Sequence, residues 1–131
     1  MGDLTKDFNR REYECNPRDC GCGKDDVTQR LADTVQVIRD AVGPVKISSG
    51  CRCKAHNARV GGKEGSAHTT GEAADIVAPG WSNKRLGTTI KSLYSKGLLP
   101  HLKYCYLIDG KTHTAVHVGV DNKKRNGVFG F

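Results

Sequence analysis

The sequence predicts a small α+β domain, in which an antiparallel sheet has helices packed on one face. Three observations support this fold class: two segments have apolar residues at helical spacing, two later segments alternate as strands do, and a glycine-rich stretch lies between them. The chain of 131 residues has the length of one domain. We therefore expect residues 1–131 to form a single domain, onto which a cysteine-rich segment, residues 1–24, packs.

The first predicted helix is a scaffold element. Asp26 and Gln29 have the spacing of a capping box, which places the start of the helix at Asp26. Gly43 and Pro44 are expected to end it, because this pair is typical of the end of a helix. The apolar face of this helix contains Val27, Leu31, Val35, Ile38 and Val42.

The middle of the chain is expected to hold a short strand, a helical turn and a second helix. Residues 45–48 have the pattern of the strand, and residues 55–60 that of the helical turn. Ser82 or Asn83 can cap the second helix, and Gly97 can end it. Its apolar face contains Leu86, Ile90, Leu93 and Tyr94.

Two strands near the end of the chain, residues 103–108 and 114–120, are expected to form a hairpin around Asp109 and Gly110. Alternation gives the second strand two different faces. One face has Val116, Val118 and Val120. These valines can pack on a helix, while His117 points to the other side between two small residues that leave room for a ligand.

The charge of the chain limits its partners. A net charge of +7 and a pI near 9.2 favour a polyanion, such as nucleic acid, a membrane surface or the anionic polymers of a bacterial wall. Trp81 and three phenylalanines are too few for a single-strand stacking surface, which argues against nucleic acid. No apolar run is long enough to cross a membrane, and charged residues near the amino terminus argue against a secretory signal.

A histidine and an aspartate, His68 and Asp75, lie seven residues apart around Gly71. A turn there can bring the imidazole and the carboxylate to one point, where His117 can join them from its strand. Two nitrogens and one oxygen, with a fourth position for water, are a ligand set of hydrolytic zinc sites. The residues therefore predict a metal site, with zinc in a cleft on the sheet face opposite the helices. Taken singly, the three can also be a loop histidine, a capping aspartate and a half-buried strand histidine.

A series of motifs extends over most of the chain. It consists of Leu4-Thr5-Lys6-Asp7-Phe8 with the early cysteines, Ser49-Gly50-Cys51-Arg52, Asn57 with Val60-Gly61-Gly62, Ser66-x-His68, Gly71-x-Ala73-x-Asp75-Ile76 and Val116-His117-Val118. Their order and spacing resemble the D-Ala-D-Ala carboxypeptidase family of zinc peptidases. That family includes vancomycin-resistance D,D-dipeptidases and phage endolysin endopeptidases, and it shares its fold with the hedgehog signalling domain. Within it, the chain resembles the short, single-domain members of phages and prophages.

The resemblance implies roles for five residues. His68, Asp75 and His117 would bind one catalytic zinc ion, while Arg52 and Ser66 would contact the substrate. The planar donor fork of Arg52 suits the carboxylate that ends a cell-wall stem peptide; the alternative is a surface arginine in an ion pair. Ser66 can donate a hydrogen bond to substrate or close the local turn through its hydroxyl.

The chain departs from the resembling family where many relatives have a catalytic base. A Glu or a second His often stands two or three residues before the last ligand, where this chain has Ala115 and Thr114. Short phage-type relatives often have Asp two positions after that ligand, where this chain has Gly119. These differences leave open a displaced base or an inactive member.

His113 is the candidate catalytic residue. On a regular strand it would face the same side as His117 but about 13 Å along, so that only a bend would bring the two close. Asp121 and Glu72 are alternatives, although the sequence favours Glu72 as a solvated loop charge.

The cysteines are candidates for a second, structural zinc ion, with disulfides as the alternative. Their spacing does not match common zinc fingers. If the chain is extended around Arg52, the two flanking thiols point away from it and brace it from behind. Cys105 is expected to be a buried strand thiol. The candidate ligands of the second ion are Cys15, Cys20, Cys22, Cys51 and Cys53.

The expected function is zinc-dependent hydrolysis of amide bonds in peptidoglycan stem peptides, by carboxypeptidase or endolysin-type endopeptidase action. The alternatives are a zinc-binding structural or wall-binding module of a phage virion without turnover, and a cysteine-rich nucleic-acid module supported only by charge and thiols. We expect a monomer with no specific nucleic-acid partner and no membrane insertion. It would be made in the cytoplasm and reach the wall through a holin-like partner or within a phage particle.

Overall fold

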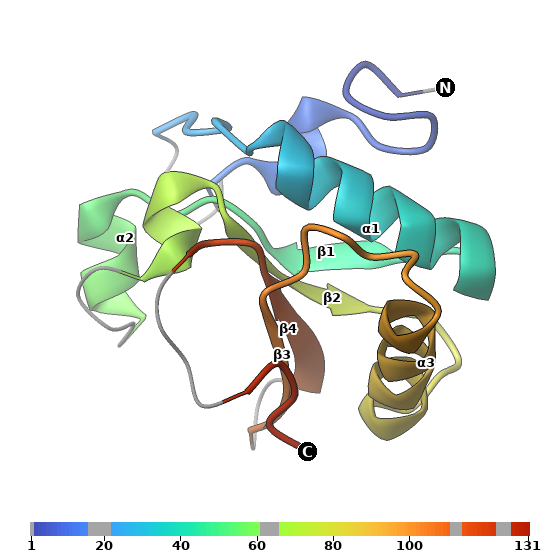
Figure 1. The fold of residues 1–131 in the computed structure, drawn as a ribbon. Coiled ribbons are helices and arrows are strands. Elements are labelled where there is room, and N and C mark those ends of the chain that lie inside the picture. Colours follow the sequence, from blue (N-terminus) through green and yellow to red (C-terminus); the bar gives the residue numbers. More distant parts are fainter. Residues whose placement is uncertain (1, 16–21, 61–65, 111–113, 123–126) are drawn as a thin grey trace.

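The computed structural model describes residues 2–15, 22–60, 66–110, 114–122 and 127–131. The elements follow in the order η1 (Arg10–Tyr13), α1 (Gln29–Val42), β1 (Lys46–Ser49), α2 (Lys54–Arg59), η2 (Ala67–Thr70), β2 (Ala73–Val77), α3 (Asn83–Ser95), β3 (Tyr104–Asp109) and β4 (Thr114–Gly119). They form a four-stranded sheet in the order β1-β2-β4-β3, antiparallel throughout (Figure 1). The predicted α+β class is confirmed.

Helix α1 begins after Thr28, and the prediction of a cap at Asp26 is wrong. The Thr28 hydroxyl accepts a hydrogen bond from Leu31 N–H at 3.3 Å. The N–H and the hydroxyl of Thr28 also donate to Gly71 O, at 2.9 and 3.0 Å. Asp26 pairs instead with Lys24. Both residues are of types that cap helices, and the contact with a loop distant in sequence favours Thr28.

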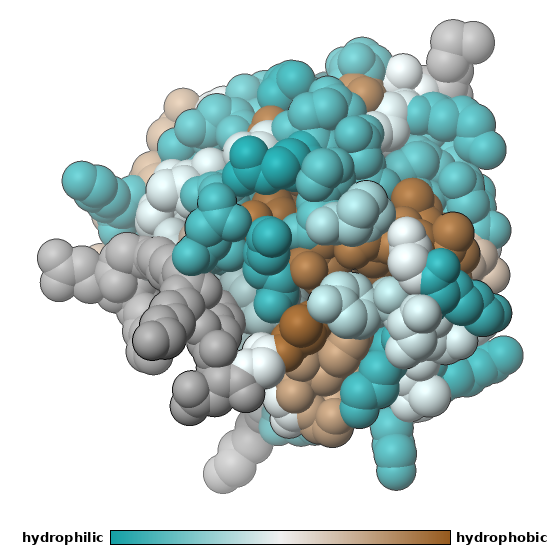
Figure 2. Space-filling model, viewed as in Figure 1, coloured by the Kyte–Doolittle hydropathy of each residue, from teal (hydrophilic) through white to brown (hydrophobic). Residues whose placement is uncertain are grey.

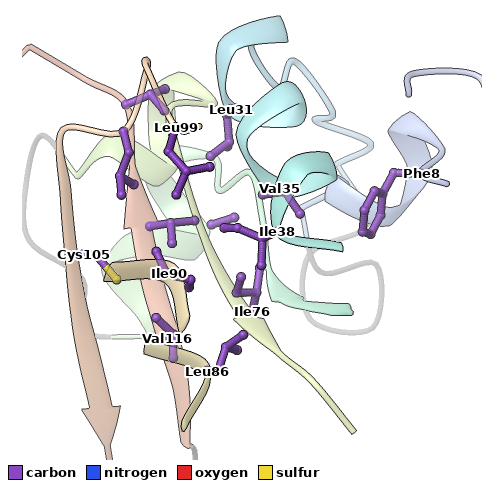
Figure 3. Packing of buried hydrophobic residues seen from close by; sticks show 14 of the residues in the cluster. Phe8, Leu31, Val35, Ile38, Ile76, Leu86, Ile90, Leu99, Cys105 and Val116 are labelled. Atoms are coloured by element: carbon purple, nitrogen blue, oxygen red, sulfur yellow. The ribbon is translucent and has the colours of Figure 1, made fainter. Parts of the chain in front are cut away.

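The hydrophobic core lies between the sheet and the helices α1 and α3 (Figure 3). Val35 and Ile38 of α1 approach Ile76 of β2, and Leu86 of α3 approaches Val116 of β4. All five side chains are at most 1% exposed. The valines of the last strand therefore face the helices, as the alternation predicts.

Strand β2 is the element that the sequence does not predict. It lies between β1 and β4 and pairs with both. The first four of its residues are buried, so neither face is solvated and no apolar–polar alternation marks it as a strand. The expected turn exists at Gly71, but the chain becomes extended immediately after Glu72 and carries Asp75 in the middle of the sheet.

The amino-terminal segment contacts the chain that follows β1. Phe8 and Tyr13 are buried in the same cluster as the helices. Tyr13 O accepts a hydrogen bond from Cys51 N–H at 2.7 Å. A Cβ on Gly50 would lie 2.7 Å from Tyr13 Cα, so this close approach requires glycine.

The surface is mainly hydrophilic, as the high charge leads one to expect. Figure 2 shows hydrophobic residues gathered in a band across the middle of one face and toward its lower edge. Leu98 and Phe131 are among the exposed large apolar side chains, at 50% and 36%. Among the described residues, no helix has both the length and the apolar character needed to span a bilayer.

Candidate metal centre

The register of the sheet aligns polar side chains on the face opposite the helices. Asp75 of β2 is paired with Ser49 of β1 and with His117 of β4, and His117 is paired with Tyr106 of β3. Directly paired residues of neighbouring strands point to the same face. One row across all four strands therefore consists of Ser49, Asp75, His117 and Tyr106.

His68 reaches this row from the short helix η2. Ser66 caps η2 by accepting His68 N–H at 3.3 Å, and Gly71 ends it in the left-handed conformation at φ 69°. A Cβ on Gly71 would lie 2.2 Å from Asp26 O, so the turn depends on glycine. The Nδ1 atom of His68 is 2.7 Å from Gly50 O, to which it can only donate. In a neutral ring the lone pair would then be on Nε2, the atom that faces Asp75.

The three predicted ligands converge on one buried point. His68 Nε2 is 3.4 Å and His117 Nδ1 is 2.8 Å from Asp75 Oδ1. Potential ligand atoms of all three lie within 4.8 Å of one another. With bonds of about 2.1 Å, two donors of a tetrahedral zinc ion are about 3.4 Å apart, so the donor types and the His68–Asp75 spacing fit zinc. The three residues are 2%, 3% and 4% exposed, and an open cleft over them stays a prediction.

Charge in this centre is concentrated on Asp75. Burial alone raises the pKa of Asp75, but the hydrogen bonds that the two histidine rings donate when protonated, together with their charges, outweigh burial and hold that pKa well below its usual value. Burial lowers the pKa of His117, against the opposing effect of Asp75. A divalent cation bound here would replace those protons, because it requires an ionised carboxylate and neutral imidazoles as ligands.

Two tyrosines of β3 fix the ring of His117. Tyr104 Oη lies 3.1 Å from His117 Nε2, and Tyr106 stacks on the ring with the centroids 4.4 Å apart. With a metal on Nδ1, the Nε2–H would donate to Tyr104, which sets the tautomer that a metal needs. Neither tyrosine was predicted from the sequence. The available signal was that the two tyrosines alternate on the strand before His117, so that both lie on one face. Only the register of β3 against β4 shows that this face is the one with His117.

Arg52 lies beside the three residues, and the structure does not make it a surface side chain. Its side chain is 15% exposed, and Nη2 is 3.6 Å from Asp75 Oδ2. Nε donates to Ser49 Oγ and Nη1 to Asn57 Oδ1, each at 3.2 Å. Arg52 N–H also donates to His68 O at 2.9 Å. Arg52 therefore forms an ion pair, as the alternative interpretation expected, but its partner is Asp75 inside the site and not a surface residue.

The other candidate residues have different surroundings. The Ser66 hydroxyl closes the turn toward His68 N–H, and its contact with a substrate stays a prediction. Glu72 lies in the loop between η2 and β2, where its partly exposed side chain pairs through Oε2 with Arg30 of α1 at 3.0 Å. Asp121 is buried just after β4, and a role as base stays a prediction. His113 lies outside the described residues.

Three of the cysteines also converge, although in a different group from the one predicted. Ligand atoms of Cys15, Cys22 and Cys53 lie within 4.8 Å of one another. Cys51 is not a member, because it is buried in the hydrophobic core. Cys20 lies outside the described residues.

Two imidazoles and one carboxylate meet at a buried point, and together they are a donor set typical of the mononuclear centres of hydrolytic zinc enzymes. Residues 6–118 match the family model described as Peptidase M15. The chain therefore belongs to this family of zinc peptidases, which confirms the resemblance to D-Ala-D-Ala carboxypeptidases. Comparison with curated proteins found no match.

Proposed function

We propose that the chain is a zinc peptidase that hydrolyses amide bonds in the stem peptides of bacterial peptidoglycan. The observation that carries this proposal is Arg52 beside His68, Asp75 and His117. A guanidinium next to a hydrolytic metal site suits a substrate with a carboxylate near the scissile bond, as stem peptides have. Membership of the M15 family supports the metallopeptidase class, and the charge of +7 suits an anionic wall.

The residues of the chain would divide the chemistry between them. When held by His68, Asp75 and His117, zinc supplies an electrophile for the scissile carbonyl and a water of lowered pKa. Arg52 has five N–H donors, of which two are used by Ser49 and Asn57, so that others remain for a substrate carboxylate. A terminal carboxylate there corresponds to carboxypeptidase action, and a side-chain carboxylate corresponds to endopeptidase action.

This chemistry also needs a side chain that accepts a proton. The position at which many family members have such a side chain does not hold one here. Ala115 stands two residues before His117 and is fully buried, so it offers only a methyl group. Asp121 and His113 are the remaining candidates for the base. Alanine at the position of the usual base favours a second candidate function. In this function the chain is a zinc-binding wall module of a virion, which keeps the fold but lacks turnover.

Digestion of purified peptidoglycan separates these functions. We expect chelator-sensitive release of D-alanine from a carboxypeptidase, or of cleaved cross-links from an endopeptidase, with products identified by mass spectrometry. His68→Ala should abolish the products, and His101→Ala is the matched control because His101 is exposed in the loop after α3. Absence of chelator-sensitive products, together with retained binding to the wall, would establish the module instead.

Access to the wall is the remaining part of the proposal. We propose that the chain is made in the cytoplasm and acts after release by a holin-like partner or from a phage particle. Expression with and without a pore-forming partner tests this, because lysis should occur only with the partner. Lysis without it would overturn the proposed route.

A further inference from the structure

Three thiols from separate parts of the chain form a second group of potential metal ligands. Cys15 follows η1, Cys22 lies between η1 and α1, and Cys53 precedes α2. Their Sγ atoms lie within 4.8 Å of one another, although 31 positions separate Cys22 from Cys53. We propose that Cys15, Cys22 and Cys53 bind a second zinc ion, which has a structural role.

The surroundings of the three sulfurs suit thiolate ligands. Cys53 Sγ accepts a hydrogen bond from His56 N–H at 3.3 Å, and such N–H···S bonds stabilise the charge of a thiolate. Cys15 N–H donates to Lys24 O at 2.6 Å, which ties Cys15 to the chain just after Cys22. Each thiol that binds zinc releases its proton to solvent, so that no oxidant or reductant is needed.

Exposure distinguishes this group from the remaining described thiols. Cys15 is buried, Cys53 is partly exposed and Cys22 is exposed, so an ion can enter from the Cys22 side. Cys51 and Cys105 are buried among apolar residues, and burial raises the pKa of each thiol to about 12. Those two remain protonated and inert, which leaves a group of three. A disulfide would use only two of its sulfurs.

The position of this group gives the ion a structural role. Cys53 directly follows Arg52, whose N–H donates to His68 O and whose side chain reaches Asp75. Cys15 lies two residues after Tyr13, whose carbonyl oxygen accepts a hydrogen bond from Cys51 N–H, and Cys22 lies close to Lys24, whose carbonyl oxygen accepts one from Cys15 N–H. An ion shared by these segments would hold the amino-terminal part of the chain against the loop that positions Arg52.

Metal content of the reduced full chain tests the proposal independently of peptidase activity. We expect two zinc ions per wild-type chain, and one in the Cys22→Ser variant. His68→Ala should also keep one ion, whereas Cys105→Ala, a matched control in the core, should keep two. Equal zinc content in wild type and Cys22→Ser would overturn the structural ion, and a loss confined to His68→Ala would support only the peptidase site.

Cobalt gives a spectroscopic readout specific for sulfur ligands. In a His68→Ala background loaded with Co²⁺, we expect a thiolate-to-cobalt charge-transfer band in the near ultraviolet. The band should disappear with Cys22→Ser and with the second variant Cys22→Ala, and persist with Cys105→Ala. Circular dichroism checks that each variant is folded. A missing band in folded His68→Ala protein, or a disulfide among the three cysteines under reducing conditions, would overturn the proposal.

Discussion

Replacing Gly119 by alanine tests whether the sheet positions the metal ligands. Gly119 pairs with Tyr104, and its missing side chain allows the tyrosine ring to lie across the strand toward His117. A Cβ on Gly119 would lie 2.1, 2.2 and 2.6 Å from Tyr104 Cε1, Cζ and Oη. These distances are far below van der Waals contact, and the Tyr104 side chain is too buried to rotate freely.

The expected cost has two parts. Overpacking costs about 1–3 kcal/mol, and loss of the Tyr104–His117 hydrogen bond costs about 0.5–1.5 kcal/mol. A total of about 1.5–4.5 kcal/mol corresponds to a fall in melting temperature of about 5–16 °C for a domain of this size. Because Tyr104 also orients His117, zinc affinity should fall about 10-fold to 100-fold.

Thermal denaturation and calorimetric zinc titration measure both effects. Gly130→Ala is the control, since its added Cβ would lie 3.3 Å from Tyr106 Cβ, a contact that a small shift relieves. A double variant with Tyr104→Ala separates steric strain from other causes, because without the ring Gly119→Ala should cost little further stability. Fully additive losses in the double variant would refute the steric reasoning, as would an unchanged melting temperature for Gly119→Ala.

Three further results are expected. Tyr104→Phe removes the oxygen next to His117 Nε2 and should lower zinc affinity about 10-fold in calorimetric titration, with the fold retained. Arg52→Lys keeps the charge but loses the planar fork, so kcat/KM on stem peptides should fall at least about 10-fold, mainly through KM. The zinc-free protein should lose stability in urea denaturation as pH falls from about 7 to 5, because burial lowers the pKa of folded His117 below about 6.5, its value in the unfolded chain.

Each of these predictions has a matched control. Tyr106→Phe keeps the stacking on His117 and should not change zinc affinity. Arg59→Lys lies on the exposed side of α2 and should leave kcat/KM unchanged; an equal loss there would show that Arg52 has no special role. In the pH series, His117→Gln should reduce the slope of the free energy of unfolding against pH, because the unfolded chain then takes up one proton fewer on acidification. An unaltered slope would contradict that assignment.

The sequence was sufficient for the elements whose pattern is local. Leu31, Val35 and Ile38 repeat at helical spacing, and Val116 and Val118 alternate as strand residues do, so α1 and β4 could be predicted closely. Strand β2 could not, because its short residues and its buried Asp75 show neither pattern. Its strand character comes from pairing on both sides, which is a tertiary property.

The candidate site divides in the same way. His68, Asp75 and His117 could be singled out from residue type and from motif order, and the structure brings them together. Tyr104 and Tyr106 could not, because their contact with His117 depends on the exact pairing of β3 with β4. A cysteine group could be suspected, but its members depend on how separate segments fold back on one another.

The pairing of Asp75 with His117 across β2 and β4 also bears on how the chain chooses its register during folding. A slip of one residue in either strand would turn that strand's polar side chain toward α1 and α3. An ionised carboxylate in that apolar layer would cost several kcal/mol, whereas Ala74 and Val118 fit it at no such cost. Misaligned sheets are therefore penalised by the same two residues that would bind the metal, and selection for catalysis would also have preserved folding fidelity.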